Sequence, residues 1–372
     1  MRIFRVFELL LASSCLMTMG CGTHTDTASE GTTSTTTTTS TIETSTTTAT
    51  TETASTTHST TKSTSTGTTG TTGTTGTTIE TVPHPPPVID CSRIPASPTS
   101  IVQMPRPRAD HGIVFDADNN LLGNDGTHIH KASDPENNEV WVPNVGQYEQ
   151  MGRLADGDIV AINASNGTVE RIASDGSRTV LDSGRSAYGL VVGPDNMVYI
   201  ADTWQTNTII RIDPDTGWAD EYIAGFGSAY AKVITFNRDY SRMYIGTVSD
   251  AGVVLYVDLD KNLEPIGNPK LFATNAGTWH DGMGMDACGN LYVNDYYSTS
   301  LYRISENGQV ALFHDFPYDD YGHGHTWGTG VGSWDDHTLY VPQPYIGQRV
   351  SALTIGVPAM DWNNGSYITI NE

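Results

Sequence analysis

The chain has 372 residues, a formal net charge of −23 and a pI of about 4.6. This charge, with no basic stripe along the sequence, argues against nucleic acid as a partner, because phosphates are bound by clustered Lys and Arg. No phosphate loop, dinucleotide-binding fingerprint or G-x-S-x-G nucleophile motif occurs, so the corresponding enzyme classes are disfavoured as well.

The first 21 residues have the layout of a signal peptide. Arg2 and Arg5 precede an apolar run that is too short to span a bilayer. The run ends in TMGC, and its Gly20-Cys21 pair resembles a bacterial lipoprotein cleavage box, in which the cysteine is lipidated. We therefore expect an exported protein, held in the cell envelope by a lipid on Cys21, with ordinary secretion as the alternative. The membrane would then be contacted only through this anchor.

Residues 22–87 are almost entirely Thr, Ser and Gly and end in PHPPP. Such a segment cannot bury enough apolar surface to fold. The sequence therefore predicts a disordered linker between the anchor and a folded domain over residues 88–372.

The folded domain contains a repeated pattern: Gly and an apolar strand, a turn with Asp or Asn, then a strand such as LYV. Copies begin at positions 112, 152, 189, 233, 282 and 330, and GMGMDACGNLYVND from Gly282 is the clearest. Periods of about 40 to 50 residues with four short strands are typical of propeller blades. The sequence predicts an all-β fold, a six-bladed β-propeller, and the regular period disfavours a β-sandwich.

Two of the four cysteines remain in the mature domain. Cys15 leaves with the signal peptide and Cys21 would carry the lipid, so Cys91 and Cys288 are left. In an oxidising compartment they are a candidate disulfide, and two free thiols are the alternative.

Candidate site residues follow from the repeat. The innermost strands of a propeller all start at one mouth of its central channel, so residues just before each repeat's first strand should converge there. They are Asp110, His111, Met151, Tyr188, Lys232, His280, Asp281 and Thr329, with His323, His325 and Trp327 from the loop DDYGHGHTW. Carboxylates can hold Ca²⁺, imidazoles can hold a transition metal, and a His beside a carboxylate can act as a general base. A purely structural hydrogen-bonding role is the alternative for each of them.

HDGMGMDACGNLYV resembles the DGM-x-x-D-x-x-G-x-LYV segment of the gluconolactonase and regucalcin-like family of six-bladed propellers. GLVVGPDNMVYIADT resembles strands of that family and of the NHL-repeat propellers. The family binds a divalent cation, usually calcium, and hydrolyses lactones or related esters. The resemblance implies that Asp281 is a metal ligand and that Asp110 or His111 replaces a ligand glutamate. Two ligand asparagines of the family fall at Tyr188 and Lys232, and an ammonium there would repel a cation.

Two functions are therefore expected. The first is an exported lactone or ester hydrolase, possible cofactor Ca²⁺, with catalytic candidates Asp281, His280 and His111. The second is a non-catalytic, envelope-tethered propeller that binds a small, anionic ligand or a protein partner. Its ligand-binding candidates are Tyr188, Lys232, His325 and Trp327. In both cases we expect a monomer with a small-molecule ligand at the channel mouth.

Overall fold

The computed structural model describes residues 88–317, 321–345 and 347–360 and the backbone of 368–370. All of them belong to one compact unit, Glu80–Glu372. The expected signal peptide, the lipidated Cys21 and the linker fall on residues 1–87, outside the described residues. The described part of the chain contains no helix with the length and hydropathy needed to cross a membrane.

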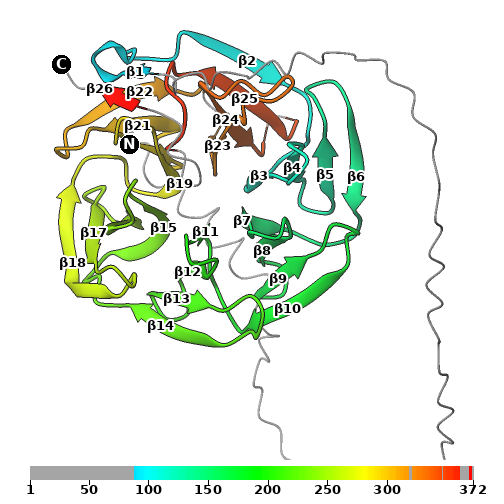
Figure 1. Ribbon diagram of the computed structural model, residues 1–372, viewed down its shortest axis with the longest axis horizontal. Coiled ribbons are helices and arrows are strands. Elements are labelled where there is room, and N and C mark those ends of the chain that lie inside the picture. Colours follow the sequence, from blue (N-terminus) through cyan, green and yellow to red (C-terminus); the bar gives the residue numbers. More distant parts are fainter. Residues whose placement is uncertain (1–87, 318–320, 346, 361–367, 371–372) are drawn as a thin grey trace, which may run out of the picture. The chain divides into compact units, whose positions relative to one another are not determined.

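Six four-stranded antiparallel sheets surround a common axis, as the repeat predicts (Figure 1). Blade 1 contains β3 (Ile113–Phe115), β4 (Leu121–Asn124), β5 (Ile129–Ala132) and β6 (Asn138–Val142). Blade 2 contains β7 (Tyr148–Arg153), β8 (Ile159–Asn163), β9 (Thr168–Ile172) and β10 (Arg178–Ser183). Blade 3 contains β11 (Leu190–Val192), β12 (Val198–Asp202), β13 (Thr208–Ile212) and β14 (Ala219–Ile223).

The remaining blades follow in chain order. Blade 4 contains β15 (Tyr230–Phe236), β16 (Arg242–Val248), β17 (Val254–Leu259) and β18 (Pro265–Ala273). Blade 5 contains β19 (His280–Met285), β20 (Leu291–Asp295), β21 (Ser300–Ile304) and β22 (Val310–Asp315). Blade 6 contains β23 (Thr326–Trp327), β24 (Thr338–Gln343), β25 (Arg349–Thr354) and β2 (Ser100–Met104).

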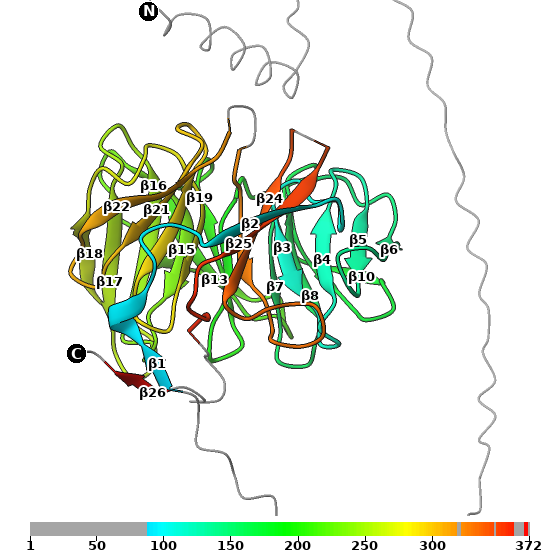
Figure 2. The same cartoon turned by 90° about the horizontal axis from the view of Figure 1, so that it is seen from above.

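Blade 6 closes the ring because it combines strands from both ends of the domain. Its order is β2-β25-β24-β23, so the early strand β2 is outermost and pairs antiparallel with the late strand β25. A second pairing of chain ends joins β1 (Val88–Asp90) in parallel to β26 (Ile368–Ile370). Figure 2 shows β2 beside β25, with β1 and β26 together at one edge.

The sixth repeat starts earlier than the sequence predicts. Its innermost strand is β23, Thr326–Trp327, whereas the expected start, Gly330, lies in a turn with a φ of +71°. A bridge between Val331 and Trp334 closes this turn. The alternating residues of GVGSW therefore form a turn before β24 and not an inner strand.

The core is divided into six hydrophobic clusters, one between each pair of neighbouring blades. Between blades 6 and 1, for example, Phe115 packs edge-on against Trp334 and Tyr340. Each sheet is thus covered on both faces by its neighbours, which is how a single blade buries its apolar side chains.

The glycine that opens several repeats has a steric cause. A Cβ added to Gly189 would lie 2.3 Å from the carbonyl oxygen of Lys232, and one on Gly282 would lie 2.5 Å from that of His323. In both cases the obstacle is the backbone of the following blade. A side chain at these positions would push neighbouring inner strands apart.

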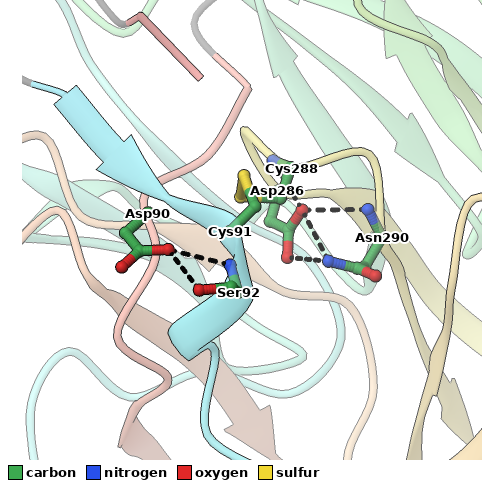
Figure 3. Close-up of a disulfide and its surroundings, with 6 residues drawn as sticks. All are labelled: Asp90, Cys91, Ser92, Asp286, Cys288 and Asn290. Carbon is green, nitrogen blue, oxygen red and sulfur yellow. Dashed lines mark hydrogen bonds between the residues drawn. A yellow bond between two sulfur atoms is a disulfide. The ribbon is translucent and has the colours of Figure 1, made fainter. Parts of the chain in front are cut away.

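A disulfide ties the start of the domain to blade 5. Cys91 begins the short 3-10 helix η1 (Cys91–Arg93) and is bonded to Cys288 in the hairpin between β19 and β20 (Figure 3). The hairpin is itself fixed by Asp286, whose Oδ1 accepts the backbone N–H groups of Cys288 and Asn290. The cross-link spans 197 residues of sequence.

Candidate functional site at the ring axis

Every blade contributes one polar side chain to a group at the axis, on the innermost strand or just before it. Contacts across the ring join Tyr188 to His323, His323 to His111 and Lys232 to Asp281. We name this group the central cluster. It consists of His111, Glu149, Tyr188, Lys232, Asp281 and His323.

Lys232 and Asp281 form a buried ion pair in this cluster. Their side chains are 3% and 2% exposed, and the Lys232 ammonium contacts Oδ1 of Asp281. The same ammonium lies 3.8 Å from the ring centre of Tyr188 and 4.9 Å from that of Trp279. Burial lowers the pKa of Lys232 well below its usual value, while the charge of Glu149 opposes this shift. Contact with the Asp281 carboxylate favours the charged ammonium.

His323 is oriented through one ring nitrogen only. Its Nδ1 lies 3.3 Å from Oδ2 of Asp281 and 3.1 Å from the Tyr188 hydroxyl. Its buried Nε2 has no hydrogen-bond partner among the described residues. Burial, together with the charges of His111 and Lys232, lowers the pKa of His323 well below its usual value. The imidazole is therefore neutral near pH 7, with Nε2 able to accept a proton when Nδ1 carries the hydrogen.

His111 has two carboxylates beside it, whereas His323 has one. Its Nδ1 lies 3.3 Å from Oδ1 of Asp110, and its Nε2 lies 3.6 Å from Oε2 of Glu149. Burial disfavours the imidazolium, but the Glu149 and Asp110 carboxylates outweigh burial and raise the pKa of His111. The two imidazoles, with ring centres 4.2 Å apart, thus have pKa values shifted in opposite directions.

His280 is bonded to backbone on both sides, although it was a catalytic candidate. Its Nδ1 accepts the N–H of Thr247 at 2.9 Å, and its Nε2 donates to the carbonyl of Ala276 at 3.0 Å. Burial lowers its pKa to about 4. With both nitrogens occupied, His280 joins β19 to blade 4 and has no free position for proton transfer.

Two further candidates, and Met151, lie beside the cluster and not in it. Trp327 packs in the core between blades 5 and 6, with its indole N–H donated to the carbonyl of Val357. Met151 belongs to the core between blades 1 and 2. Nδ1 of His325 accepts a hydrogen bond from the side-chain N–H of Asn294 at 3.2 Å, and burial lowers the pKa of His325 to about 3.

Asp295 holds the segment that carries Asp281 in place. Its Oδ1 accepts the N–H groups of Thr278 and Trp279 at 2.8 and 2.6 Å, and its Oδ2 accepts that of Ser298. In the same way, Asn124 at the end of β4 accepts the N–H of Tyr148 at the start of β7, and Asp202 at the end of β12 accepts that of Ser186, which precedes β11. A carboxylate or amide at the end of a blade's second strand therefore holds the segment that leads into the innermost strand of the same or the next blade.

The repeat pattern in the sequence did not identify Glu149 and Gln150 as residues of the site. Gln150 donates its side-chain N–H to the carbonyl of Asp281 at 3.2 Å. The pairing of β7 with β8 shifts register between Tyr148 and Met151, which marks a bulge. A bulge changes which residues face the axis. The available signal was the pair of adjacent polar residues in an otherwise apolar strand.

The central cluster does not fit the calcium site that the family resemblance implies. Asp281, the expected ligand, is engaged by Lys232 and His323, and Asp110 is paired with His111. An ammonium in direct contact with a ligand carboxylate repels a divalent cation at close range. Among the described residues, one group brings three metal-type ligand atoms within 4.8 Å of one another, and it lies elsewhere, at Asp335, Asp336 and His337.

Comparison with known proteins agrees with the fold. No family model and no curated protein matches the sequence. A gluconolactonase from Xanthomonas campestris superposes with a TM-score of 0.58 at 15% identity, over 74% of this chain and 95% of that one. A catalytically inactive His-to-Ala variant of virginiamycin B lyase from Staphylococcus aureus, bound to quinupristin, gives 0.52 at 15%, over 68% and 99%. An auxiliary nutrient binding protein from Bacteroides thetaiotaomicron gives 0.55 at 12%, over 68% and 69%.

These neighbours define the class of fold. The domain is a six-bladed β-propeller similar in architecture to gluconolactonases and to virginiamycin B lyase. At such low identity the likeness extends to the fold, and function must be argued from the site.

Proposed function

We propose that the central cluster hydrolyses a lactone or ester of a small polar molecule without a bound metal ion. The observation that carries this proposal is His323, held at Nδ1 by Asp281 and Tyr188 while Nε2 is left without a partner. A carboxylate that orients an imidazole in this way is the arrangement of a general base.

The proposed step balances with the residues of the cluster. Nε2 of His323 takes a proton from water as the water oxygen bonds to the acyl carbon. Lys232 stabilises the negative charge that develops on the acyl oxygen. The carbon–oxygen bond to the leaving group then breaks, and His111, with its raised pKa, supplies a proton to the departing alkoxide. His323 then releases its proton to solvent and His111 takes one up, which restores both imidazoles.

Turnover on a panel of γ- and δ-lactones and p-nitrophenyl esters tests the proposal, with and without EDTA. We expect activity that resists EDTA and falls by about 100-fold or more in kcat/KM in His323→Gln, the usual size of a general-base contribution. His337→Gln is the matched control, because His337 is half exposed and paired with Asp336 outside the cluster. Loss of activity with EDTA, or an unchanged rate in His323→Gln, would contradict the proposal.

A non-catalytic binding function is the second candidate. Lys232 supports it, since a built-in cation suits an anionic small ligand, and one structural neighbour is named as a nutrient binding protein. In the same panel this function predicts saturable binding of anionic compounds without turnover. Binding would weaken in Lys232→Met and be unaffected in His323→Gln.

We further propose that the domain acts outside the cytoplasm as a monomer anchored through Cys21. The Cys91–Cys288 disulfide supports export, because such bonds persist in oxidising compartments. Fractionation of cells expressing the full chain checks this: the protein should partition with membranes, and Cys21→Ala should release it. A Cys21→Ala variant that stays membrane-bound would refute lipid anchoring.

A further inference from the structure

A continuous row of aromatic rings borders the central cluster. Neighbouring ring centres along it are 5.4, 5.6, 6.3, 4.8 and 5.1 Å apart. We name it the aromatic rim. In order it consists of Tyr230, Trp204, Trp279, Tyr296, Tyr321 and Tyr345.

The rim belongs to one face of the ring. Trp204, Tyr296 and Tyr345 follow the second strands of blades 3, 5 and 6, while Trp279 precedes β19 and Tyr230 begins β15. In a propeller these two kinds of connection lie at the same end of the blades, the end where the innermost strands start. Blades 3 to 6 therefore contribute to a single surface next to the central cluster.

Several rim side chains are too exposed to serve the core. Trp204 is 48% exposed, Tyr230 45% and Tyr345 57%, and none of them belongs to an inter-blade hydrophobic cluster. The Tyr345 hydroxyl is hydrogen-bonded to that of Tyr296 at 3.0 Å, so its ring is held in place. Large, fixed and half-exposed aromatic rings are typical of ligand-binding surfaces.

The rim leads directly to the polar groups of the site. The Lys232 ammonium lies 4.9 Å from the centre of the Trp279 ring, and Tyr296 packs edge-on to His323 at 5.3 Å. The rim therefore lies beside the buried polar groups of the central cluster, and its own tyrosine hydroxyls are the groups that a ligand on it would meet. Apolar surfaces with a few placed polar groups are the usual composition of small-molecule sites.

Two classes of flat-faced polymer stack on such a row, nucleic acid bases and sugar rings. The net charge of −23 opposes a polyanion, because phosphate binding depends on Lys and Arg neutralisation. A neutral saccharide has apolar C–H faces for the rings and hydroxyls for the tyrosine tips, and its binding carries no charge penalty. We propose that the aromatic rim binds a neutral oligosaccharide chain next to the central cluster. This binding goes beyond the proposed hydrolysis and does not require it.

Calorimetry and tryptophan fluorescence of the full chain test the inference with cellohexaose, xylohexaose, maltohexaose and chitohexaose. We expect saturable binding of at least one, weakened tenfold or more by Trp204→Ala and by Tyr345→Ala. Trp218→Ala is the matched control. Trp218 is 54% exposed, but it lies in the turn between β13 and β14, at the opposite end of blade 3.

Several results would overturn the inference. They are binding of none of the four saccharides, equal affinity in Trp204→Ala and Trp218→Ala, or tighter binding of single-stranded dT20 than of any saccharide. His323→Gln separates this inference from the proposed hydrolysis, since we expect it to lower kcat/KM by about 100-fold or more and leave saccharide affinity within about twofold. Two rim variants are used so that misfolding of one leaves the other informative.

Discussion

At the scale of single residues, the ion pair of Lys232 and Asp281 dominates the electrostatics of the site. Both side chains are almost fully removed from water, so each charge depends on the other for compensation. The aromatic faces of Tyr188 and Trp279 add further stabilisation to the ammonium. We therefore expect the two side chains to act as one unit in the stability of the fold.

Removal of one partner should cost more than removal of both. We expect Lys232→Met or Asp281→Leu alone to lower the free energy of unfolding by about 3–5 kcal/mol, because an unpaired buried charge remains. The double variant should lose clearly less than the sum of the two single variants. Urea denaturation of the four proteins measures this. Strict additivity would mean that the two charges are not coupled in the folded protein.

Part of the site could be derived from repeat phase alone. His111, Tyr188, Lys232 and Asp281 all precede or begin a repeat's first strand, and the structure brings them together. His280 stands beside Asp281 in sequence, yet it points between blades, because successive strand residues alternate in direction. Sequence spacing predicts the end of the strand at which a residue lies. The face of the sheet on which its side chain lies depends on local twist and bulges.

At the scale of elements, His280 links β19 to β16. Thr247, which donates to Nδ1, is in β16, so the neutral Nε2–H tautomer is required. A proton added at Nδ1 would face the N–H of Thr247 and remove this bond. The contact is therefore sensitive to pH as well as to packing.

Acidification should weaken the fold through His280. Its folded pKa of about 4 lies below the ordinary unfolded value, so the unfolded state binds protons first as pH falls. Its contribution is complete above about pH 6.5 and is lost progressively down to about pH 4, roughly 3 kcal/mol in all. Urea denaturation at pH 7 and pH 4.5 measures it. His280→Gln should be less stable at pH 7 but show a shallower pH dependence, and a slope equal to that of the unmodified protein would exclude this role.

The sixth repeat shows where element prediction fails. GVGSWDD has the composition of a first strand and turn, but the real first strand is four residues earlier and only two residues long. The sequence pattern is ambiguous there because alternating small and apolar residues also suit the tight turn between Val331 and Trp334. Pairing with β24, a tertiary contact, decides between the two.

At the scale of the whole molecule, two features join the beginning of the domain to its end. β2 completes blade 6, and β1 pairs with β26. The disulfide adds a covalent link from η1 to blade 5 (Figure 3). The ring is closed by the pairing of β2 with β25, so detachment of β2 would open it. Because the disulfide anchors the segment just before β2, we expect it to contribute to stability.

Loss of the disulfide should lower the melting temperature. A cross-link spanning 197 residues restricts the unfolded chain by about 5 kcal/mol in the chain-entropy estimate. We expect the Cys91→Ser/Cys288→Ser double variant to melt well below the oxidised protein in scanning calorimetry. The reduced, unmodified protein is the control and should melt at about the temperature of the variant. Equal melting temperatures of variant and oxidised protein would show that the bond adds no stability.

The sequence alone predicts the all-β class, the number of blades and, for five of the six repeats, a start that lies in or next to the innermost strand. Glycine positions, turn residues and apolar alternation are local signals, and they recur with the period of the blade. The folded structure was needed to establish how the ring closes with β2, which side chains meet at the axis and which rings form the aromatic rim. These depend on contacts between residues far apart in the chain. No local pattern encodes which face a bulged strand presents or where the Lys232 ammonium comes to rest.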